Sequence, residues 1–170
     1  GIAAEEARKL EAAGVMGIDV SGAGGTSFAA VEYFRAKDGR NIYHRRLGDV
    51  FWDWGIPTAI SIVEVAQTVN IPVIASGGVR SGLDAAKALA LGASLASLAQ
   101  PVLQAAVEGV KKTRKMLQLL IEELRNTMFL VGAESPQQLQ KVPLVITGKT
   151  AEWLTLRGFD IETYARRSGN

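Results

Sequence analysis

The residues best suited to chemistry form a paired-glycine turn between an expected strand and an expected helix. The run Gly77–Arg80 follows the apolar segment Val73–Ala75 and precedes helix-forming residues that begin near Gly82. Glycine lacks a Cβ and tolerates positive φ, so such a turn can wrap its N–H groups around a phosphate. The N-terminal dipole of the helix and the Arg80 guanidinium would add positive potential there. The run therefore predicts an anion site.

A second glycine-rich turn follows an earlier apolar segment. The run Asp19–Ser27 contains three glycines and comes after an expected strand over 15–20. A third expected strand, over 94–99, ends at Gln100–Pro101. The carboxyl ends of parallel strands meet at one edge of a sheet, and ligands bind there. We therefore expect a phosphorylated ligand at this edge, with the loops 76–82 and 99–103 on either side of its phosphate.

Composition and charge exclude several classes of protein. The chain has 170 residues, 48% of them hydrophobic, and a net charge of +2, which gives no electrostatic reason to expect a nucleic-acid partner. It has no cysteine and a single histidine, His44, so it offers neither a thiolate metal site nor a histidine-rich zinc site. No apolar run approaches the roughly 20 residues of a membrane span, and no signal-peptide pattern opens the chain. We expect a soluble, cytoplasmic protein without a membrane partner.

Helices and strands are expected to alternate along the chain. Before, between and after the three expected strands, residue patterns predict helices over 3–13, 58–69, 82–91, 103–130 and 150–157, with a short helix after Ser135. The basic cluster at 111–115 is expected on the solvated face of its helix. Residues 28–56 mix aromatic and charged side chains and predict a long, functional loop.

This alternation predicts an α/β fold with a parallel sheet covered by helices. A dinucleotide site is weakly supported, because no G-x-G-x-x-G run with a following acidic residue is present. A (β/α)8 barrel fits the two phosphate-type strand ends better. Three strands cannot close a barrel, so the chain is expected to be part of a larger protein or to rely on another chain.

Three runs in this order, Asp19–Phe28, Asp53–Thr58 and Ser76–Ala88, resemble type 2 isopentenyl-diphosphate isomerase, an FMN-dependent (β/α)8 barrel enzyme. The similarity extends over nearly the whole chain and includes Thr147–Trp153. It implies that residues 1–170 are a single partial domain, the C-terminal half of the barrel with strands 6–8.

The resemblance also implies an activity and its cofactors. The family isomerises isopentenyl diphosphate to dimethylallyl diphosphate with reduced FMN as acid and base, and it uses NADPH or another reductant and Mg2+. Its substrate-contacting glutamine, its metal-binding glutamate and a lysine near the flavin belong to the N-terminal half, so activity of this chain alone is in doubt. A homo-oligomer, or association with that N-terminal half, is expected.

Carried over residue by residue, the resemblance implies an FMN site in which the phosphate turn, the turn after the last strand and two hydroxyl positions contact the cofactor. These residues are Gly77, Gly78, Val79, Arg80, Ala99, Gln100, Ser21 and Thr26. Two roles are equally open for Asp19, a buried carboxylate near the site or a hydrogen-bond partner of a neighbouring turn. Core packing is favoured for Trp52 and Trp54 over a wall beside the flavin, and a solvated face for the basic residues Arg35, Lys37, Arg45 and Arg46.

Two rival functions remain open. One is another FMN-dependent barrel oxidoreductase that acts on 2-hydroxy acids, which would need a histidine base near the flavin. His44 is the single candidate, and its polar context does not suit that role. The other rival is a non-catalytic, phosphate-binding half-barrel.

Overall fold

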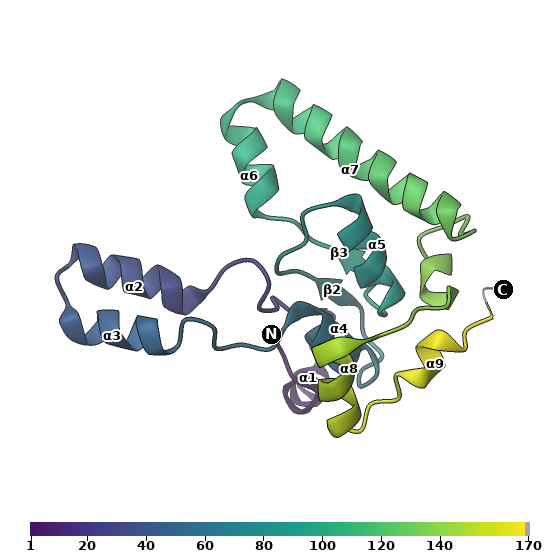
Figure 1. The fold of residues 1–170 in the computed structure, drawn as a ribbon, viewed down its shortest axis with the longest axis horizontal. Coiled ribbons are helices and arrows are strands. Elements are labelled where there is room, and N and C mark those ends of the chain that lie inside the picture. The colour runs from purple at the N-terminus through teal and green to yellow at the C-terminus, as the bar shows by residue number, and fades with distance from the viewer. Residues whose placement is uncertain (169–170) are drawn as a thin grey trace.

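The computed structural model describes residues 1–168, and its centre is a small parallel sheet (Figure 1). The strands are β1 (Ile18–Asp19), β2 (Val73–Ala75) and β3 (Leu95–Ala96), in the order β1-β2-β3. Both pairs are parallel, and Ile74 is in register with Asp19 on one side and with Leu95 on the other. The predicted parallel arrangement is confirmed, and β1 and β3 are shorter than the apolar runs from which they were expected.

Helices pack against one face of this sheet. They include α1 (Ala4–Ala12), α4 (Thr58–Ala66) and α5 (Gly82–Ala90), all within a few residues of their expected bounds. Strand residues that alternate toward this face meet the apolar side of α4. The fully buried aliphatic residues shared by these elements are Ile18, Val20, Ile60, Ile62, Val63, Val65, Val73 and Ala75.

The opposite face of the sheet lacks a covering layer in the described residues. Asp19 and Leu95 alternate with the buried strand positions, and Leu95 is 59% exposed. An apolar strand residue with this exposure is unusual in a parallel sheet, because parallel sheets are normally covered on both faces. The sheet is therefore packed on one side only.

Residues 28–56 form a helical hairpin rather than the predicted loop. Helices α2 (Phe28–Asp38) and α3 (Ile42–Val50) pack against each other and project away from the sheet (Figure 1). Ser27 and Asn41 cap the two helices by accepting hydrogen bonds from the third amide beyond them. We call the segment 28–50 the arm.

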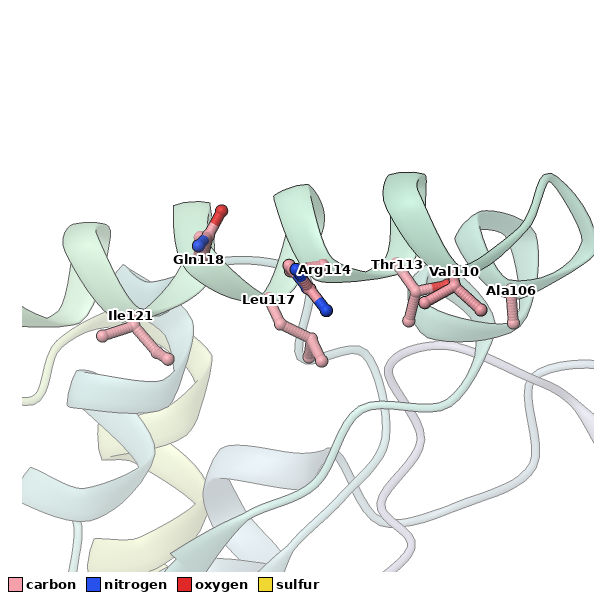
Figure 2. A pocket seen from close by; sticks show the side chains of 7 residues that line it. All are labelled: Ala106, Val110, Thr113, Arg114, Leu117, Gln118 and Ile121. Carbon is pink, nitrogen blue, oxygen red and sulfur yellow. The ribbon is translucent and has the colours of Figure 1, made fainter.

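The predicted helix over 103–130 is two helices. Helix α6 (Gln100–Val107) ends before Gly109, whose φ of +110° an L-residue rarely adopts, and α7 (Val110–Leu130) follows. Near its middle α7 packs on α5, but none of its residues is fully buried. Figure 2 shows the apolar side chains of Val110, Leu117 and Ile121 on the side of α7 that overhangs the body, along a shallow groove of about 440 Å³.

The C-terminal segment wraps back over the first helices. It contains a 3₁₀ turn η1 (Gln138–Lys141), α8 (Gly148–Leu156) and α9 (Glu162–Ala165), of which the last was not predicted. Glu64 on α4 is 1% exposed and accepts hydrogen bonds from the Ala4 amide (3.1 Å), Trp153 Nε1 (3.0 Å) and Arg157 Nη2 (3.2 Å). One buried carboxylate thus ties α1, α4 and α8 together. Among the described residues, no helix combines the length and the apolar character needed to cross a membrane.

Candidate functional site

A cleft of about 640 Å³ opens at the carboxyl ends of the three strands. It is lined by Ser21, Gly22, Gly25, Thr26, Phe28, Ser76, Gly77, Gly78, Val79, Arg80, Ser97, Ala99, Gln100 and Pro101. All eight residues of the predicted site are in this set. The structure therefore brings together positions that are up to 79 residues apart in the sequence, from Ser21 to Gln100.

The two glycine turns interlock at the floor of the cleft. Gly77 and Gly78 have φ values of +100° and +81°. A Cβ on Gly77 would overlap the Gly22 carbonyl, and a Cβ on Gly78 would overlap the Gly24 carbonyl. The Thr58 hydroxyl donates to the Gly77 carbonyl at 2.6 Å and fixes the turn from the side of α4. These glycines are therefore required by packing between the turns.

The N-terminus of α5 is already occupied by carboxylates. Asp84 Oδ2 accepts from the amides of Arg80 and Ser81, both at 3.1 Å, and the Ser81 hydroxyl accepts from the Asp84 amide at 3.0 Å. Glu123 on α7 accepts from the Gly82 amide at 2.6 Å. The first donors of α5 thus have acceptors within the chain, as in a capping box.

The capping box also perturbs Asp84. Burial opposes ionisation of its carboxyl group, but hydrogen bonds from Ser81 and from the Arg80 amide outweigh this, so the pKa of Asp84 lies below its usual value. Asp84 is therefore a carboxylate over a wider pH range than a free aspartate.

Free backbone donors lie on either side of the Arg80 side chain. Within residues 1–168, the amides of Gly78 and Val79 have no protein acceptor. Across the cleft, α6 begins after Ala99 with no side-chain cap, and Pro101 lies in its first turn. The uncapped start of α6 thus presents amides and the positive end of its dipole to the same space. These two groups of donors, unlike the first amides of α5, are therefore available to a ligand.

Arg80 is the one charged side chain among the residues that line the cleft. Its Nη1 donates to the Gly78 carbonyl at 3.2 Å, and its Nη2 donates to the Gly24 carbonyl at 3.1 Å. The guanidinium therefore links the two glycine turns. Because a guanidinium carries five N–H donors, others remain for an anion.

Asp19 bonds to the turns rather than being buried, which settles the alternative left open for it. Its Oδ1 accepts from the Ser21 amide at 3.0 Å and from the Ser76 hydroxyl. The Ser76 hydroxyl also accepts from the Ser21 amide at 3.0 Å. Asp19 and Ser76 thus join the ends of β1 and β2 beside the cleft.

The aromatic residues that could have flanked a flavin belong to the arm and its end. Trp52 packs edge-on against Tyr33 and Phe34, and Trp54 is 82% exposed and contacts Phe51. Neither tryptophan lines the cleft. The four basic residues assigned to a solvated face are on α2 and α3, outside the cleft lining.

Sequence reasoning missed several lining residues that lie within or beside the expected turns. Phe28 begins the arm, Ser76 directly precedes the glycine pair, and Ser97 and Pro101 flank the third strand end. Their positions next to the predicted turns could have identified them as lining residues. Among residues 1–168, no group of three or more histidine or carboxylate side chains is arranged to hold a metal ion.

Comparison with known proteins agrees with this geometry. The model of the FMN-dependent dehydrogenase family matches residues 1–145. The chain is 56% identical over 168 residues to an isopentenyl-diphosphate delta-isomerase of Methanothermobacter thermautotrophicus, covering 99% of this chain and 46% of the relative. It is 53% identical to the isomerase of that name from Pyrococcus abyssi, covering 98% of this chain and 44% of the relative. The expected similarity to isopentenyl-diphosphate isomerases is confirmed, and the chain spans about half the length of these curated relatives.

Solved structures of flavoenzymes share the fold. A mandelate oxidase superposes with a TM-score of 0.65 at 32% identity, over 87% of this chain and 39% of the oxidase. A lactate oxidase of Pediococcus acidilactici gives a TM-score of 0.66 at 28% identity, over 86% of this chain and 35% of that protein. The family match, the glycine turns and the shared fold lead to one assignment: this chain belongs to the FMN-dependent dehydrogenase family.

Proposed function

We propose that this chain is the FMN phosphate-binding half of a type 2 isopentenyl-diphosphate isomerase, which converts isopentenyl diphosphate to dimethylallyl diphosphate. One observation carries the proposal. In a chain 56% identical to a protein of that name, two glycine turns, Arg80 and the start of α6 converge on one cleft. Residues 1–170 would then be a single partial domain with strands 6–8 of a (β/α)8 barrel.

The cleft suits the phosphate end of FMN. Its volume, about 640 Å³, is within the range of cofactor sites. Its wall offers the free amides of Gly78 and Val79, the amides at the start of α6 and the Arg80 guanidinium, all of which match a dianionic phosphate. Atoms beyond Cα at Gly77 or Gly78 would fill the space between the turns. This donor set is the reason to assign the phosphate to this end.

The residues of this chain would bind and orient rather than transfer protons. When bound and reduced, FMN supplies the acid and base chemistry of the isomerisation. Gly78, Val79 and Arg80 would hold the phosphate, while Ser21 and Thr26 would contact the flavin from the β1 turn. The residues that line the cleft include neither a histidine nor a carboxylate. The groups that contact the diphosphate substrate, and the ligand for Mg2+, would therefore come from the other half of the barrel.

That second half is part of the proposal. The open face of the sheet and the apolar groove under α7 are the surfaces that it would cover (Figure 2). The resemblance supports NADPH as reductant, a cytoplasmic location and a homo-oligomer of the complete enzyme. The covering partner would be the N-terminal half of the enzyme or, for this chain alone, a second copy.

Oxidation of a 2-hydroxy acid is the rival that the structural neighbours favour, because mandelate and lactate oxidases share the fold. Such an oxidoreductase would need a histidine beside the flavin. His44 is the only histidine of the chain, and it lies on α3, where its ring nitrogen contacts the Asn41 side chain at 3.2 Å. His44 is not among the cleft residues, so this chain supplies no such histidine at the cleft, and the isomerase proposal rests on the 56% identity to a protein of that name.

The test uses the full-length protein that carries this sequence. We expect it to purify with, or take up, FMN, and to convert isopentenyl diphosphate when reduced FMN and Mg2+ are supplied. Oxidation of mandelate or lactate in the same preparation is the matched control and should be absent. Flavin binding with 2-hydroxy acid oxidation and no isomerisation would establish the rival. A protein that takes up no flavin would leave only phosphate binding.

A further inference from the structure

We propose that Asp19 and Ser76 form a clamp that holds Ser21 in the left-handed backbone conformation and thereby positions the β1 turn beside the flavin. The inference rests on the proposed function, because it assigns positioning residues to the same cleft. The clamp is built from side chains at the ends of β1 and β2, and neither residue belongs to the phosphate turn itself.

The starting observation is a backbone outlier. Ser21 has a φ of +41°, and among residues 1–168 only Arg40 is another non-glycine residue with positive φ. Arg40 lies just after α2, in an exposed connection. Ser21 lines the cleft instead. A left-handed serine costs free energy and persists only where its surroundings determine it, and such residues concentrate at ligand sites.

The contacts that determine it come from both strands. The Ser21 amide donates to Asp19 Oδ1 and to the Ser76 hydroxyl, each at 3.0 Å. The Ser76 hydroxyl in turn donates to the same carboxylate oxygen. Next along the chain, the Gly22 amide donates to the Ser76 carbonyl at 2.9 Å. Two successive amides of the β1 turn are therefore held by Asp19 and Ser76.

The clamp also fixes the two turns relative to each other. Ser76 directly precedes Gly77, so the clamp binds the β1 turn at the root of the phosphate turn. Arg80 binds the far side of the β1 turn through the Gly24 carbonyl. The turn from Ser21 to Gly24 is thus held at both ends by residues of the phosphate turn and its root. Removing the clamp takes away the side-chain contacts of the Ser21 amide, while the backbone bond from the Gly22 amide to the Ser76 carbonyl remains.

The clamp predicts different effects for three substitutions. Asp19→Ala removes one of the two acceptors of the Ser21 amide and the carboxylate that orients the other, the Ser76 hydroxyl, so we expect Ser21 to relax to negative φ and the β1 turn to shift. Asp19→Asn keeps an oxygen acceptor at the same place. Ser21→Gly removes the conformational cost, because glycine adopts the left-handed region readily. Asp19→Ala should therefore weaken FMN binding less in a Ser21→Gly background than in wild type.

The experiment measures FMN dissociation constants of the full-length protein by flavin fluorescence. We expect Asp19→Ala to weaken binding about tenfold, the lower end for loss of hydrogen bonds to a charged group, and Asp19→Asn to stay within about threefold of wild type. In the Ser21→Gly background, the further loss caused by Asp19→Ala should fall below about threefold. Asp49→Ala, which removes an exposed carboxylate on α3, is the matched control. Circular dichroism melting confirms that each variant is folded.

A merely structural role would give equal losses for Asp19→Ala in both backgrounds, and that result overturns the clamp. Wild-type affinity in Asp19→Ala also overturns it, as does an asparagine variant no better than alanine. Hydrogen exchange of the Ser21 and Gly22 amides in ligand-free protein tests the clamp independently of FMN binding. Exchange should accelerate in Asp19→Ala but not in Asp19→Asn. Unchanged exchange contradicts the clamp. A wild-type protein that binds no FMN, with exchange as expected, would refute the proposed function and leave the clamp as a device of the turn.

Discussion

At the scale of single residues, Arg80 has two tasks that one substitution can separate. Its guanidinium bridges the carbonyls of Gly24 and Gly78 and is the one charge in the cleft lining. The bridge stabilises the shape of the cleft for any ligand, whereas the positive charge strengthens binding only of a ligand that carries a phosphate. FMN and riboflavin, which differ by that phosphate, therefore report the two tasks separately.

We predict that Arg80→Ala weakens FMN binding by about 1.5–3 kcal/mol, the scale of a hydrogen bond to a charged group. Riboflavin binding should fall much less, because riboflavin makes no use of the charge. Isothermal titration of both ligands with the full-length protein measures the difference. Lys87→Ala, which removes an exposed cation on α5, should change neither affinity. Equal losses for the two ligands would leave Arg80 as a bridge between turns only.

Asp84 gives a pH-dependent prediction at the same scale. Its folded pKa is lowered, so its contribution to stability is complete above the unfolded value of about 3.9 and is lost as pH falls through the folded pKa. Urea unfolding at a series of pH values down to about pH 3 should show this acid loss in wild type and a smaller loss in Asp84→Asn. Ser81→Ala, which removes the other half of the box, should cost about 1 kcal/mol at neutral pH. An identical acid response in wild type and Asp84→Asn would contradict the role of the carboxylate.

At the scale of elements, contact with the β1 turn restricts which residues the phosphate turn can hold, as does the backbone conformation of the phosphate turn itself. Gly78 combines positive φ with contact to the Gly24 carbonyl, whereas Gly132 has positive φ and open space around it. We predict that Gly78→Val abolishes flavin retention and lowers the melting temperature, while the helical circular dichroism signal persists. Gly132→Val should cost only the backbone strain, about 1–2 kcal/mol, and should retain flavin. Full flavin content in Gly78→Val would show that the turns do not need to interlock.

The core elements were predictable because each has local signals that agree with its packing. The helix α5 has a capping serine and a stop at Gly92, and β2 is a short apolar run that ends at a glycine pair. The arm was missed because its aromatic and charged residues follow no clear period and its two helices stabilise each other. The caps Ser27 and Asn41 were readable signals of it.

The candidate site was predictable to the same extent. Its members lie in turns at strand ends, and that pattern is visible in the sequence. The hydrogen-bond partners of these residues were not predictable, because they come from segments distant in the sequence. Glu123 reaches the start of α5 from α7, and Ser76 reaches Ser21 from another strand. The sequence thus locates the cleft but not which amides are free inside it.

At the scale of the whole molecule, the buried carboxylate Glu64 joins the two ends of the chain. It holds Arg157, whose pKa is raised by the hydrogen bonds that its guanidinium donates to Glu5 and then to Glu64. We predict that Glu64→Ala destabilises the protein by about 3–5 kcal/mol, because it leaves Arg157 and Trp153 without their buried partner. Glu5→Ala removes the exposed partner of the same arginine and should cost much less, because solvent screens an exposed ion pair. Urea unfolding followed by tryptophan fluorescence compares the two, and similar losses would contradict the central place of Glu64.

The uncovered surfaces lead to a prediction about association. Open sheet edges and an exposed apolar face favour pairing with another chain. We predict that residues 1–170 do not remain monomeric at micromolar concentration, and that adding the N-terminal half of the enzyme replaces self-association with a defined complex. Light scattering measures the mass. A monodisperse species of 18.1 kDa would contradict the prediction and the placement in a barrel.

The arm leaves and rejoins the body at nearly one point. The Ala23 amide donates to the Ile56 carbonyl at 2.8 Å, Ala23 pairs with Pro57, and the Ser27 hydroxyl donates to the Trp52 carbonyl. Because these contacts close its root, the hairpin contributes no strand to the sheet, and its two helices pack mainly on each other. Phe28, at its base, lines the cleft. Shortening the arm beyond Phe28 should therefore leave the strand registers and the two glycine turns in place.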